Sequence, residues 1–479
     1  MDLHIKLIAN IEQVKQIADK NSDWVIRSFI CGKNRSISMA VAYIQGLADK
    51  NYIQQMINDL TEDLEQYDAS NKLLANQEVF EYIQNLHLSG SNFTEVTDFD
   101  KLCQQLLSGD TIIMLDGLSK SLALSSGGSE GRSISSPSSQ GVLRGPQEGF
   151  VEKLATNKTL IRKIIKDSRL QIENKVIGRV TKTSVAVVYV KGICDGSLVK
   201  KVNLRLERIA IDGILESGNI EELIQDRAFS IFPTVLNTER PDTVAAELLN
   251  GRIAILVDGT PFVLIVPAVF VQFFQASEDY YNNYIISSLI RVLRYTAFLL
   301  TLFVPALYIA LTTFHNEMIP TVLLINIAAQ AEGTPFPTFI EALLLEAIFE
   351  IFREASIRMP KAIGSAISMV GGLVMGQAAV QAGIVSEGML IVVGLTAMSS
   401  FILPHYNMSF AVRILRFVFM VLAASFGLFG IFIGLMGMLF HLCSLRSLGV
   451  PYMEPLSPRV TKTQRDAILR LPLNREEAE

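Results

Sequence analysis

The pattern of apolar and polar positions changes near residue 285. Before it, short apolar segments alternate with polar ones, and after it long apolar runs without charge appear. The run from Tyr295 to Thr313 is long enough to cross about 30 Å of hydrocarbon. Similar uncharged runs cover Gly364–Ser386, Gly388–Pro404 and Phe417–Phe440. The pattern predicts a water-soluble front part followed by an α-helical membrane domain with several spans.

The front part contains an internal repeat. Ile37–Ile53 and Thr183–Val199 align without gaps, and the identical pairs are Ser38/Ser184, Ala40/Ala186, Val41/Val187, Tyr43/Tyr189, Gly46/Gly192 and Asp49/Asp195. A second match follows in the same order, between Leu106–Gly117 and Leu248–Gly259. Matched order at two separated places predicts two copies of one α/β unit.

Each copy has local signals for strands, helices and turns. The β-branched and aromatic stretch VAVVYVKG predicts a strand, and SLVKKVNLRLERI after it has the apolar spacing of a helix. Gly109 and Gly251 suit left-handed helix C-terminal caps. Asp116-Gly117 and Asp258-Gly259 predict tight hairpins in which both central residues have positive φ.

These signals give the expected fold class: duplicated soluble α/β domains (α+β) followed by a multi-span α-helical membrane domain. The expected segments are copy 1 (1–122), a Ser/Gly-rich linker (123–144), copy 2 (145–284), the membrane domain (285–443) and a C-terminal tail (444–479). The linker composition, SSGGSEGRSISSPSSQG, cannot form a core and predicts flexibility. Arg291 and Arg294 before the first span place that end in the cytoplasm by the positive-inside tendency.

One helix in the membrane part is amphipathic. Over Phe339–Ser356, apolar side chains fill one face, and the charged side chains Glu346, Glu350, Arg353, Glu354 and Arg358 fill the other. Such a helix either lies at the membrane interface or spans with its polar face toward water. Four spans follow in the first case and five in the second. The distribution of charge leaves both open, and five is our preferred interpretation.

The composition and motifs exclude several kinds of function. A net charge of −5 gives no basic field for nucleic acid. We find no GxxxxGK[ST] phosphate loop, no HExxH, no paired cysteines and no GxSxG, and the five histidines are scattered. We therefore expect no enzyme, no metal site and no cofactor.

Several motifs together resemble a known family. They are Gly145-Pro146-Gln147-Glu148-Gly149-Phe150, Asn237-Thr238-Glu239-Arg240-Pro241-Asp242, Pro335-Phe336-Pro337 and Gly371-Gly372 with Gly376-Gln377. Their order from about Gly145 to Pro455 resembles the A subunit of the bacterial spore germinant receptors, the GerA family. The first copy and the linker match less well, so the identity of the germinant does not transfer.

The resemblance implies a multi-pass protein of the spore inner membrane with its soluble domains on the cytoplasmic (core) side. Its partners would be a transporter-like B subunit, a lipoprotein C subunit and further copies of itself. It would be the oligomeric component that conducts ions when nutrient binds. Alternatives are a non-conducting sensor or scaffold subunit, the SpoVA-operon-associated paralogue, and a secondary transporter. The membrane part lacks the internal repeat of many such transporters.

Three groups of residues are candidate sites. A ring of Glu346, Glu350 and Glu354, beside Arg353, would attract cations in an oligomer; the other interpretation is a solvated face of an interfacial helix. Gly371, Gly372 and Gly376 predict close helix packing. The third group comprises Asn237, Thr238, Glu239, Arg240, Pro241 and Asp242. It either couples the soluble and membrane parts or caps a helix that has Pro241 in its first turn.

Overall fold

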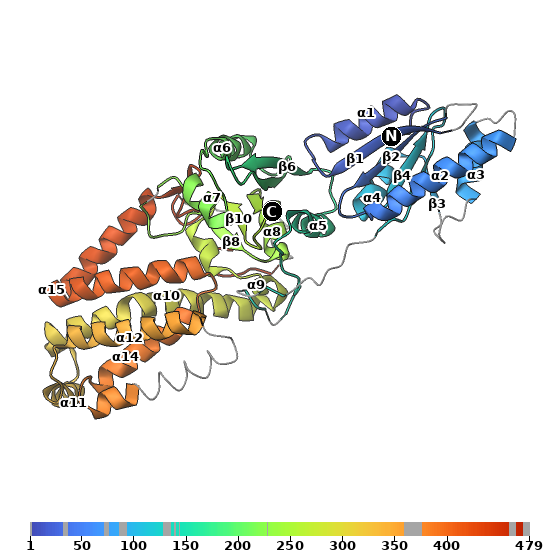
Figure 1. Ribbon diagram of the computed structural model, residues 1–479. Helices are drawn as coiled ribbons and strands as arrows, with labels where there is room; N and C mark the ends of the chain where they lie inside the picture. Colours follow the sequence, from blue (N-terminus) through green and yellow to red (C-terminus); the bar gives the residue numbers. More distant parts are fainter. Residues whose placement is uncertain are drawn as a thin grey trace. The chain divides into compact units, whose positions relative to one another are not determined.

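The computed structural model describes residues 2–31, 37–70, 76–85, 93–127, 136–137, 140–142, 144–227, 229–358, 376–458 and 466–472 (Figure 1). The chain forms two compact units. Unit 1 contains residues 1–225 and 235–267, and unit 2 contains residues 226–234 and 268–479.

The first half of unit 1 is a three-layer arrangement around an antiparallel sheet of order β1-β2-β4-β5-β3. The strands are β1 (Trp24–Cys31), β2 (Ile37–Ile44), β3 (Phe93–Val96), β4 (Thr111–Leu115) and β5 (Ser121–Leu124). The helices are α1 (Leu7–Ala18), α2 (Lys50–Ser70), α3 (Asn76–Asn85) and α4 (Phe99–Ser108).

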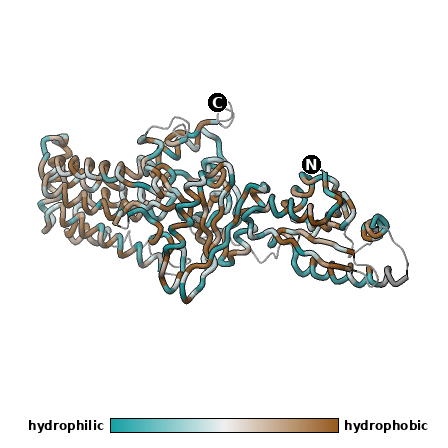
Figure 2. The backbone as a smooth tube through the Cα atoms, turned by 90° about the horizontal axis from the view of Figure 1, so that it is seen from above, coloured by the Kyte–Doolittle hydropathy of each residue, from teal (hydrophilic) through white to brown (hydrophobic). Residues whose placement is uncertain are grey.

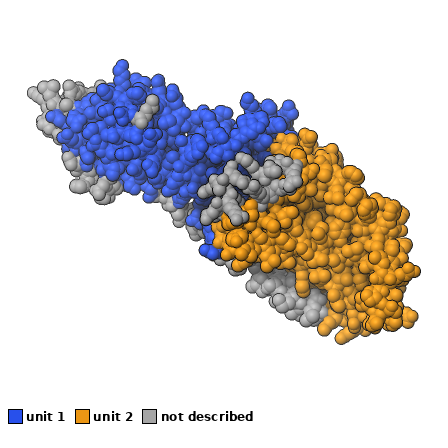
Figure 3. Space-filling model, turned by 180° about the vertical axis from the view of Figure 1, so that it is seen from behind, with its two compact units in different colours: residues 1–225, 235–267 blue, residues 226–234, 268–479 orange. Residues whose placement is uncertain are grey.

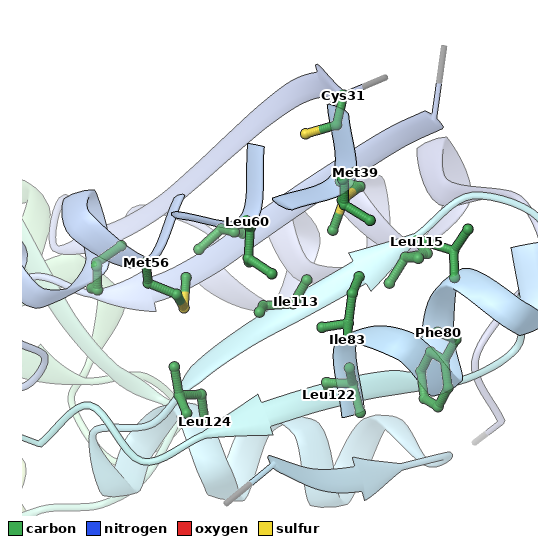
Figure 4. Close-up of a cluster of buried hydrophobic side chains, with 14 of the residues drawn as sticks. Cys31, Met39, Met56, Leu60, Phe80, Ile83, Ile113, Leu115, Leu122 and Leu124 are labelled. Atoms are coloured by element: carbon green, nitrogen blue, oxygen red, sulfur yellow. The ribbon is translucent and has the colours of Figure 1, made fainter. Parts of the chain in front are cut away.

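The inner strand β2, between β1 and β4, is buried on both faces. Met39, Val41 and Tyr43 pack with side chains of α2 and α3, and Figure 4 shows this cluster around Met39, Leu60, Phe80 and Ile113. The alternate residues Ala40, Ala42 and Ile44 pack against α1 and α4. Successive side chains of a strand point to opposite faces, so a strand covered on both sides must be apolar throughout.

The second half of unit 1 has a sheet of the same order, β6-β7-β9-β10-β8, also antiparallel. Its strands are β6 (Leu170–Ile177), β7 (Thr183–Val190), β8 (Leu236–Thr238), β9 (Ile253–Val257) and β10 (Val263–Val266), and its helices are α5 (Leu154–Ile164), α6 (Gly196–Glu207), α7 (Ser217–Ile224) and α8 (Pro241–Leu249). The strand and helix predicted over VAVVYVKG and SLVKKVNLRLERI are confirmed as β7 and α6.

The turns after β4 and β9 use the same hydrogen bond. Asp116 Oδ1 accepts from the Leu7 backbone N–H at 2.9 Å, and Asp258 Oδ1 accepts from the Leu154 N–H at 3.0 Å. Each aspartate thereby satisfies the first N–H of α1 or α5, which has no partner within the helix. Both sheets thus share strand order and local hydrogen bonds, while their origin by duplication stays a prediction.

The hairpins predicted at the Asp-Gly pairs are present, but their turn type was predicted wrongly. The loops run from Leu115 to Ser121 and from Val257 to Val263, so they are longer than two residues. Only the glycines, Gly117 at φ 84° and Gly259 at φ 92°, have positive φ. The aspartates adopt ordinary φ values because their carboxylates bind a helix start. The left-handed caps are confirmed, with φ of 101° at Gly109 and 81° at Gly251.

Two other features bear on the predicted boundaries in unit 1. The sheet continues into the region assigned to the linker, because Ser126 is buried and its Oγ lies 2.6 Å from Thr111 Oγ1. The turn before β1 also contacts the second sheet: Ser22 N–H donates to the Ile172 carbonyl at 3.0 Å, and Lys20 N–H donates to Gln171 Oε1 at 3.1 Å. The two halves of unit 1 are therefore hydrogen-bonded to each other.

Unit 2 is mainly helical. Its helices are α9 (Glu278–Tyr281), α10 (Tyr284–Thr313), α11 (Thr321–Glu332), α12 (Thr338–Arg358), α14 (Glu387–Phe401) and α15 (Tyr406–Ser444), with the 3-10 helices η2 (Phe270–Phe274) and η3 (Asn316–Met318) and the short strands β11 (Arg446–Ser447) and β12 (Val450–Pro451). Figure 2 shows hydrophobic residues along most of these helices, and Figure 3 shows unit 2 in orange. Among the described residues, α10 and α15 are long and apolar enough to cross a membrane. Most of the run predicted over Gly364–Ser386 lies outside the described residues.

Helix α15 reverses direction at Gly427. That residue has φ 62° and ψ −142°, which is not helical. A Cβ built on Gly430 would lie 2.1 Å from the Leu422 carbonyl oxygen, and one on Gly434 would lie 2.7 Å from Phe419 Cε1. Residues 422 and 430 of a continuous helix would be about 12 Å apart along its axis. The run predicted as one span over Phe417–Phe440 is therefore divided between two arms, 406–426 and 428–444.

A group of charges, buried except for the partly exposed Asp466, lies around the start of α10, and we call it the junction cluster: Asp279, Arg291, Arg294, Asp466 and Arg470. Asp279 Oδ2 accepts from Arg294 Nη1 at 2.7 Å. Arg291 Nη1 lies 2.9 Å from Asp466 Oδ1, and Arg470 Nη1 donates to the Asp279 carbonyl at 2.6 Å. The C-terminal segment around Asp466–Arg470 is thus attached to the N-terminal end of α10.

Candidate functional site in the helical unit

The charged face of α12 packs against α15 within unit 2. Arg416 Nη2 lies 2.8 Å from Glu346 Oε2 and 3.3 Å from Glu350 Oε1. Arg413 Nη1 donates to Glu350 Oε2 at 2.9 Å. Glu346 and Arg416 are both 0% exposed. We call Glu346, Glu350, Arg353, Arg413 and Arg416 the arginine–glutamate cluster.

Helical spacing puts these side chains on facing sides of the two helices. Glu346, Glu350 and Arg353 lie at i, i+4 and i+7 of α12, so they share one face. Arg413 and Arg416 are three residues apart on the first arm of α15 and likewise share a face. Ion pairs cost desolvation when buried but attract strongly where water is excluded. Breaking either pair would therefore leave a charge uncompensated in an apolar bundle.

The predicted acidic ring is only partly brought together. Glu346 and Glu350 meet the arginines of α15, whereas Glu354 is more than half exposed and pairs with Arg358 on its own helix at 2.7 Å. The partners Arg413 and Arg416 were not identified as such from the sequence. The available signal was two arginines at helical spacing directly before an apolar run. A role for the acids in a pore stays a prediction, and in this arrangement arginines neutralise two of them.

Arg353 differs from the other arginines of the cluster. Its Nη2 donates to Ser409 Oγ at 3.4 Å, and its guanidinium lies 5.3 Å from the centre of the Phe401 ring. Among the described residues it has no carboxylate within ion-pair distance, since Glu346, Glu350 and Glu354 of α12 pair with other arginines. The cluster therefore contains three guanidinium groups for two carboxylates.

The segment Asn237–Asp242 lies in unit 1, at the end of β8 and the start of α8. Pro241 occupies the first turn of α8 with Asp242 beside it, and the N-cap residue Arg240 makes no side-chain cap hydrogen bond. Arg240 donates through Nη2 to Asp242 Oδ2 at 2.6 Å and to the Pro146 carbonyl at 3.0 Å. Thr238 Oγ1 donates to Gln140 Oε1 at 2.6 Å. The motif thereby holds Gln140 and Pro146 beside the second sheet, and the Glu239 carbonyl accepts from Phe150 N–H at 2.8 Å.

A titratable group lies beside this motif. Burial, reinforced by the negative charge of Glu216, raises the pKa of Glu221 to about 7, although a hydrogen bond with Asn237 opposes the shift. A carboxyl group with this pKa changes charge near neutral pH. Coupling of the motif to the membrane part stays a prediction.

The small residues of the third predicted site are only partly described. A Cβ on Gly376 would lie 3.1 Å from Leu390 Cδ1, so this glycine permits close approach to α14. Gly371 and Gly372 lie outside the described residues. Nearby, Glu341 is buried, and its Oε2 accepts from Ser386 Oγ at 2.9 Å. No group of three or more His, Cys, Asp or Glu side chains suited to a metal ion occurs within the described part of the chain.

Known proteins resemble this chain over almost its whole length. The family described as Bacillus/Clostridium GerA spore germination protein matches residues 12–479. "Spore germination protein KA" of Bacillus subtilis (strain 168) is 48% identical, over 97% of this chain and 84% of that protein. "Uncharacterized membrane protein YfkQ" of the same organism is 41% identical, over 97% of this chain and 88% of that protein. The crystal structure of the N-terminal domain of the A subunit of the Bacillus megaterium spore germinant receptor GerK3 is 38% identical, covering 57% of this chain and 99% of that one, with a TM-score of 0.45.

Proposed function

Because this chain belongs to the GerA family of spore germination proteins, we propose that it is the A subunit of a nutrient germinant receptor and the component that conducts ions. It is a multi-pass protein of the spore inner membrane with its front part on the cytoplasmic (core) side. It works with a transporter-like B subunit, a lipoprotein C subunit and further copies of itself. Its front part consists of two copies of one α/β unit, which the matched sheet order and the matched Asp116 and Asp258 hydrogen bonds support.

The proposal includes an even number of membrane crossings. The C-terminal segment is bonded to the start of α10, since Asp466 pairs with Arg291. Ser288 Oγ also donates to the Arg470 carbonyl at 3.1 Å. Both ends of the membrane part would then lie on one side of the bilayer. This favours four spans or another even number over the five spans preferred from the sequence.

One observation carries the conduction proposal: a buried set of ion pairs joins two helices of an apolar bundle. Charges at such positions are expensive and are retained at ion pathways and gates in membrane proteins. In the closed state, Arg416 and Arg413 neutralise Glu346 and Glu350 and hold α12 against α15. Nutrient binding would separate the helices and leave the carboxylates facing water, where they attract cations.

The test is ion flux through the purified receptor complex in liposomes. Glu350→Gln should weaken the α12–α15 contact and raise flux without nutrient several-fold, whereas Glu354→Gln on the exposed side of the same helix should not. Glu350→Gln leaves Arg413 without its carboxylate partner, which could cause misfolding. The double variant Glu350→Gln with Arg413→Gln removes this unpaired charge, so a rise in flux that persists in it does not come from misfolding. A complex that binds nutrient normally and passes no ions would refute conduction.

The second candidate is a non-conducting sensor or scaffold subunit. The hydrogen bonds from Arg240 to the segment around Pro146 favour this second function. A connection of this kind between two segments can transmit a movement without any pore. Under this function, replacing Glu346, Glu350 and Glu354 together by Gln leaves ion release by the complex unchanged.

A further inference from the structure

All three arginines of the arginine–glutamate cluster have N–H groups without acceptors. Among the described residues, Arg353 Nη1, Arg413 Nε and Nη2, and Arg416 Nε and Nη1 are buried and make no hydrogen bond. Arg413 is 8% exposed. Arg353 lies near the positive charges of Arg413 and Arg416 as well as the negative charge of Glu350. Buried donors left unpaired each cost about 1–3 kcal/mol, so an acceptor placed here would be favoured.

The cluster also has an uncompensated positive charge. The negative charges of Glu346 and Glu350 balance the positive charges of Arg416 and Arg413. The positive charge of Arg353 is left without a carboxylate in an ion pair with it. The segment 359–375, which follows α12, contains no Asp or Glu that could supply the missing charge. An anionic group is therefore the complementary ligand, and the planar guanidinium fork matches the paired oxygens of a phosphate.

The side chains around these arginines indicate where the anion comes from. Arg413 lies 5.0 Å from the Phe410 ring centre and 5.5 Å from that of Tyr406, and Arg353 lies over Phe401. These three aromatic residues are 50–65% exposed. Tyrosine is enriched at the membrane–water interface, so the exposed Tyr406 beside Arg413 indicates the level of the lipid headgroups.

We propose that Arg353 and Arg413 bind the headgroup phosphate of an anionic phospholipid, whose acyl chains lie along the exposed apolar side chains of Phe401 and Phe410. The inference rests on the membrane location of the proposed function, but not on ion conduction. The lipid would neutralise the third guanidinium and complete the contact between α12 and α15.

The test is thermal denaturation of the full chain purified in a neutral detergent. Phosphatidylglycerol, added at a few molecules per chain, should raise the Tm by several degrees, and phosphatidylcholine should raise it much less. Arg353→Gln should abolish the difference between the two lipids. Arg358→Gln, on the same helix but exposed and paired with Glu354, should retain it. Arg353→Lys, which keeps the charge without the fork, should retain part of it.

Each other outcome overturns the inference. An equal rise with inorganic phosphate alone would make the site one for a free anion. An unchanged lipid response in Arg353→Gln, in a chain that still melts cooperatively, would exclude these residues. A change in the number of associated copies without a change in lipid response would mean that Arg353 pairs with an acid of a second copy. If the chain failed to float with vesicles at all, the proposed membrane location would fail instead.

Discussion

Arg162 of α5 donates hydrogen bonds to both carboxylate oxygens of Asp23, from Nη2 at 3.1 Å and 2.9 Å, and its Nε adds another at 3.1 Å. Both side chains are buried, although they come from different halves of unit 1. Asn21 Oδ1 accepts from the same guanidinium at 3.0 Å and from Ile172 N–H at 3.0 Å. The Asp23–Arg162 pair therefore joins the turn before β1 to α5, and Asn21 joins the same turn to β6.

Asp23→Ala should lower the free energy of unfolding of unit 1 by about 3–5 kcal/mol, because it leaves the Arg162 charge buried without a partner. Denaturant titration of the full chain in detergent measures the change. Replacing both residues, Asp23→Ala with Arg162→Met, should recover most of the loss. Glu207→Ala, which breaks the exposed pair with Lys175, should cost less than about 1 kcal/mol.

Arg240→Lys should expose residues 140–150 to proteases. Lysine keeps the charge but cannot contact Asp242 and the Pro146 carbonyl together, as the guanidinium does. Limited proteolysis should cut this segment several-fold faster than in the unchanged chain. Arg252→Lys, at a partly buried pair with Glu247, is the matched control. Equal cleavage rates in all three chains would contradict the role given to Arg240.

The stability of unit 1 should fall as pH rises through about 7. Burial raises the pKa of Glu221 in the folded chain above its ordinary value, so the folded state holds a proton that the unfolded state has lost. Below the pKa of the unfolded state, the Glu221 carboxyl is protonated in both states and does not lower the free energy of unfolding. Above the pKa of the folded state it is charged in both states, and the full loss of stability from burying the charge is present. Glu221→Gln should remove this part of the pH dependence. The measurement is Tm from pH 4 to 9, and parallel curves for both chains would count against the shift.

Gly427→Ala should disrupt the reversal of α15. At φ 62° and ψ −142° a side chain is strained, and the new Cβ would lie 2.7 Å from His315 Cε1 and 3.0 Å from Phe314 Cβ. We expect a lower yield of folded protein and a Tm lower by several degrees. Gly437→Ala, where nothing lies within 4 Å of the added Cβ, should be neutral or slightly stabilising. Similar melting of both variants would argue against the reversal.

Cys443, near the end of the second arm of α15, should be reached from the same side of the membrane as the start of α10. Three chains with a single cysteine each are compared: one keeps Cys443, one carries Asn283→Cys and one carries Glu317→Cys. A membrane-impermeant maleimide should label Cys443 and Asn283→Cys from one side of the membrane. It should label Glu317→Cys, which lies between α10 and α11, from the other side. Labelling of Cys443 and Glu317→Cys from one side would require an odd number of crossings.

The sequence by itself determined the elements and their order in the chain. Strand β7 and helix α6 follow from β-branched content and 3.6-residue spacing. The glycine caps follow from a conformation that only glycine adopts easily. The amphipathic helix α12 was also predictable, because side chains three or four residues apart must share a face. All these signals are local, so a single segment is enough to show them.

Only the tertiary structure decided which distant residues meet. Nothing in the periodicity of α12 indicates that Glu346 faces Arg416, 70 positions later, rather than water. In the same way, Asp23 and Arg162 are each ordinary in their own segments. Which charges become partners depends on how helices and sheets pack, on the turn at Gly427 and on the burial that packing produces. That information is held by the folded chain as a whole, because ion pairing acts through space and not along the sequence.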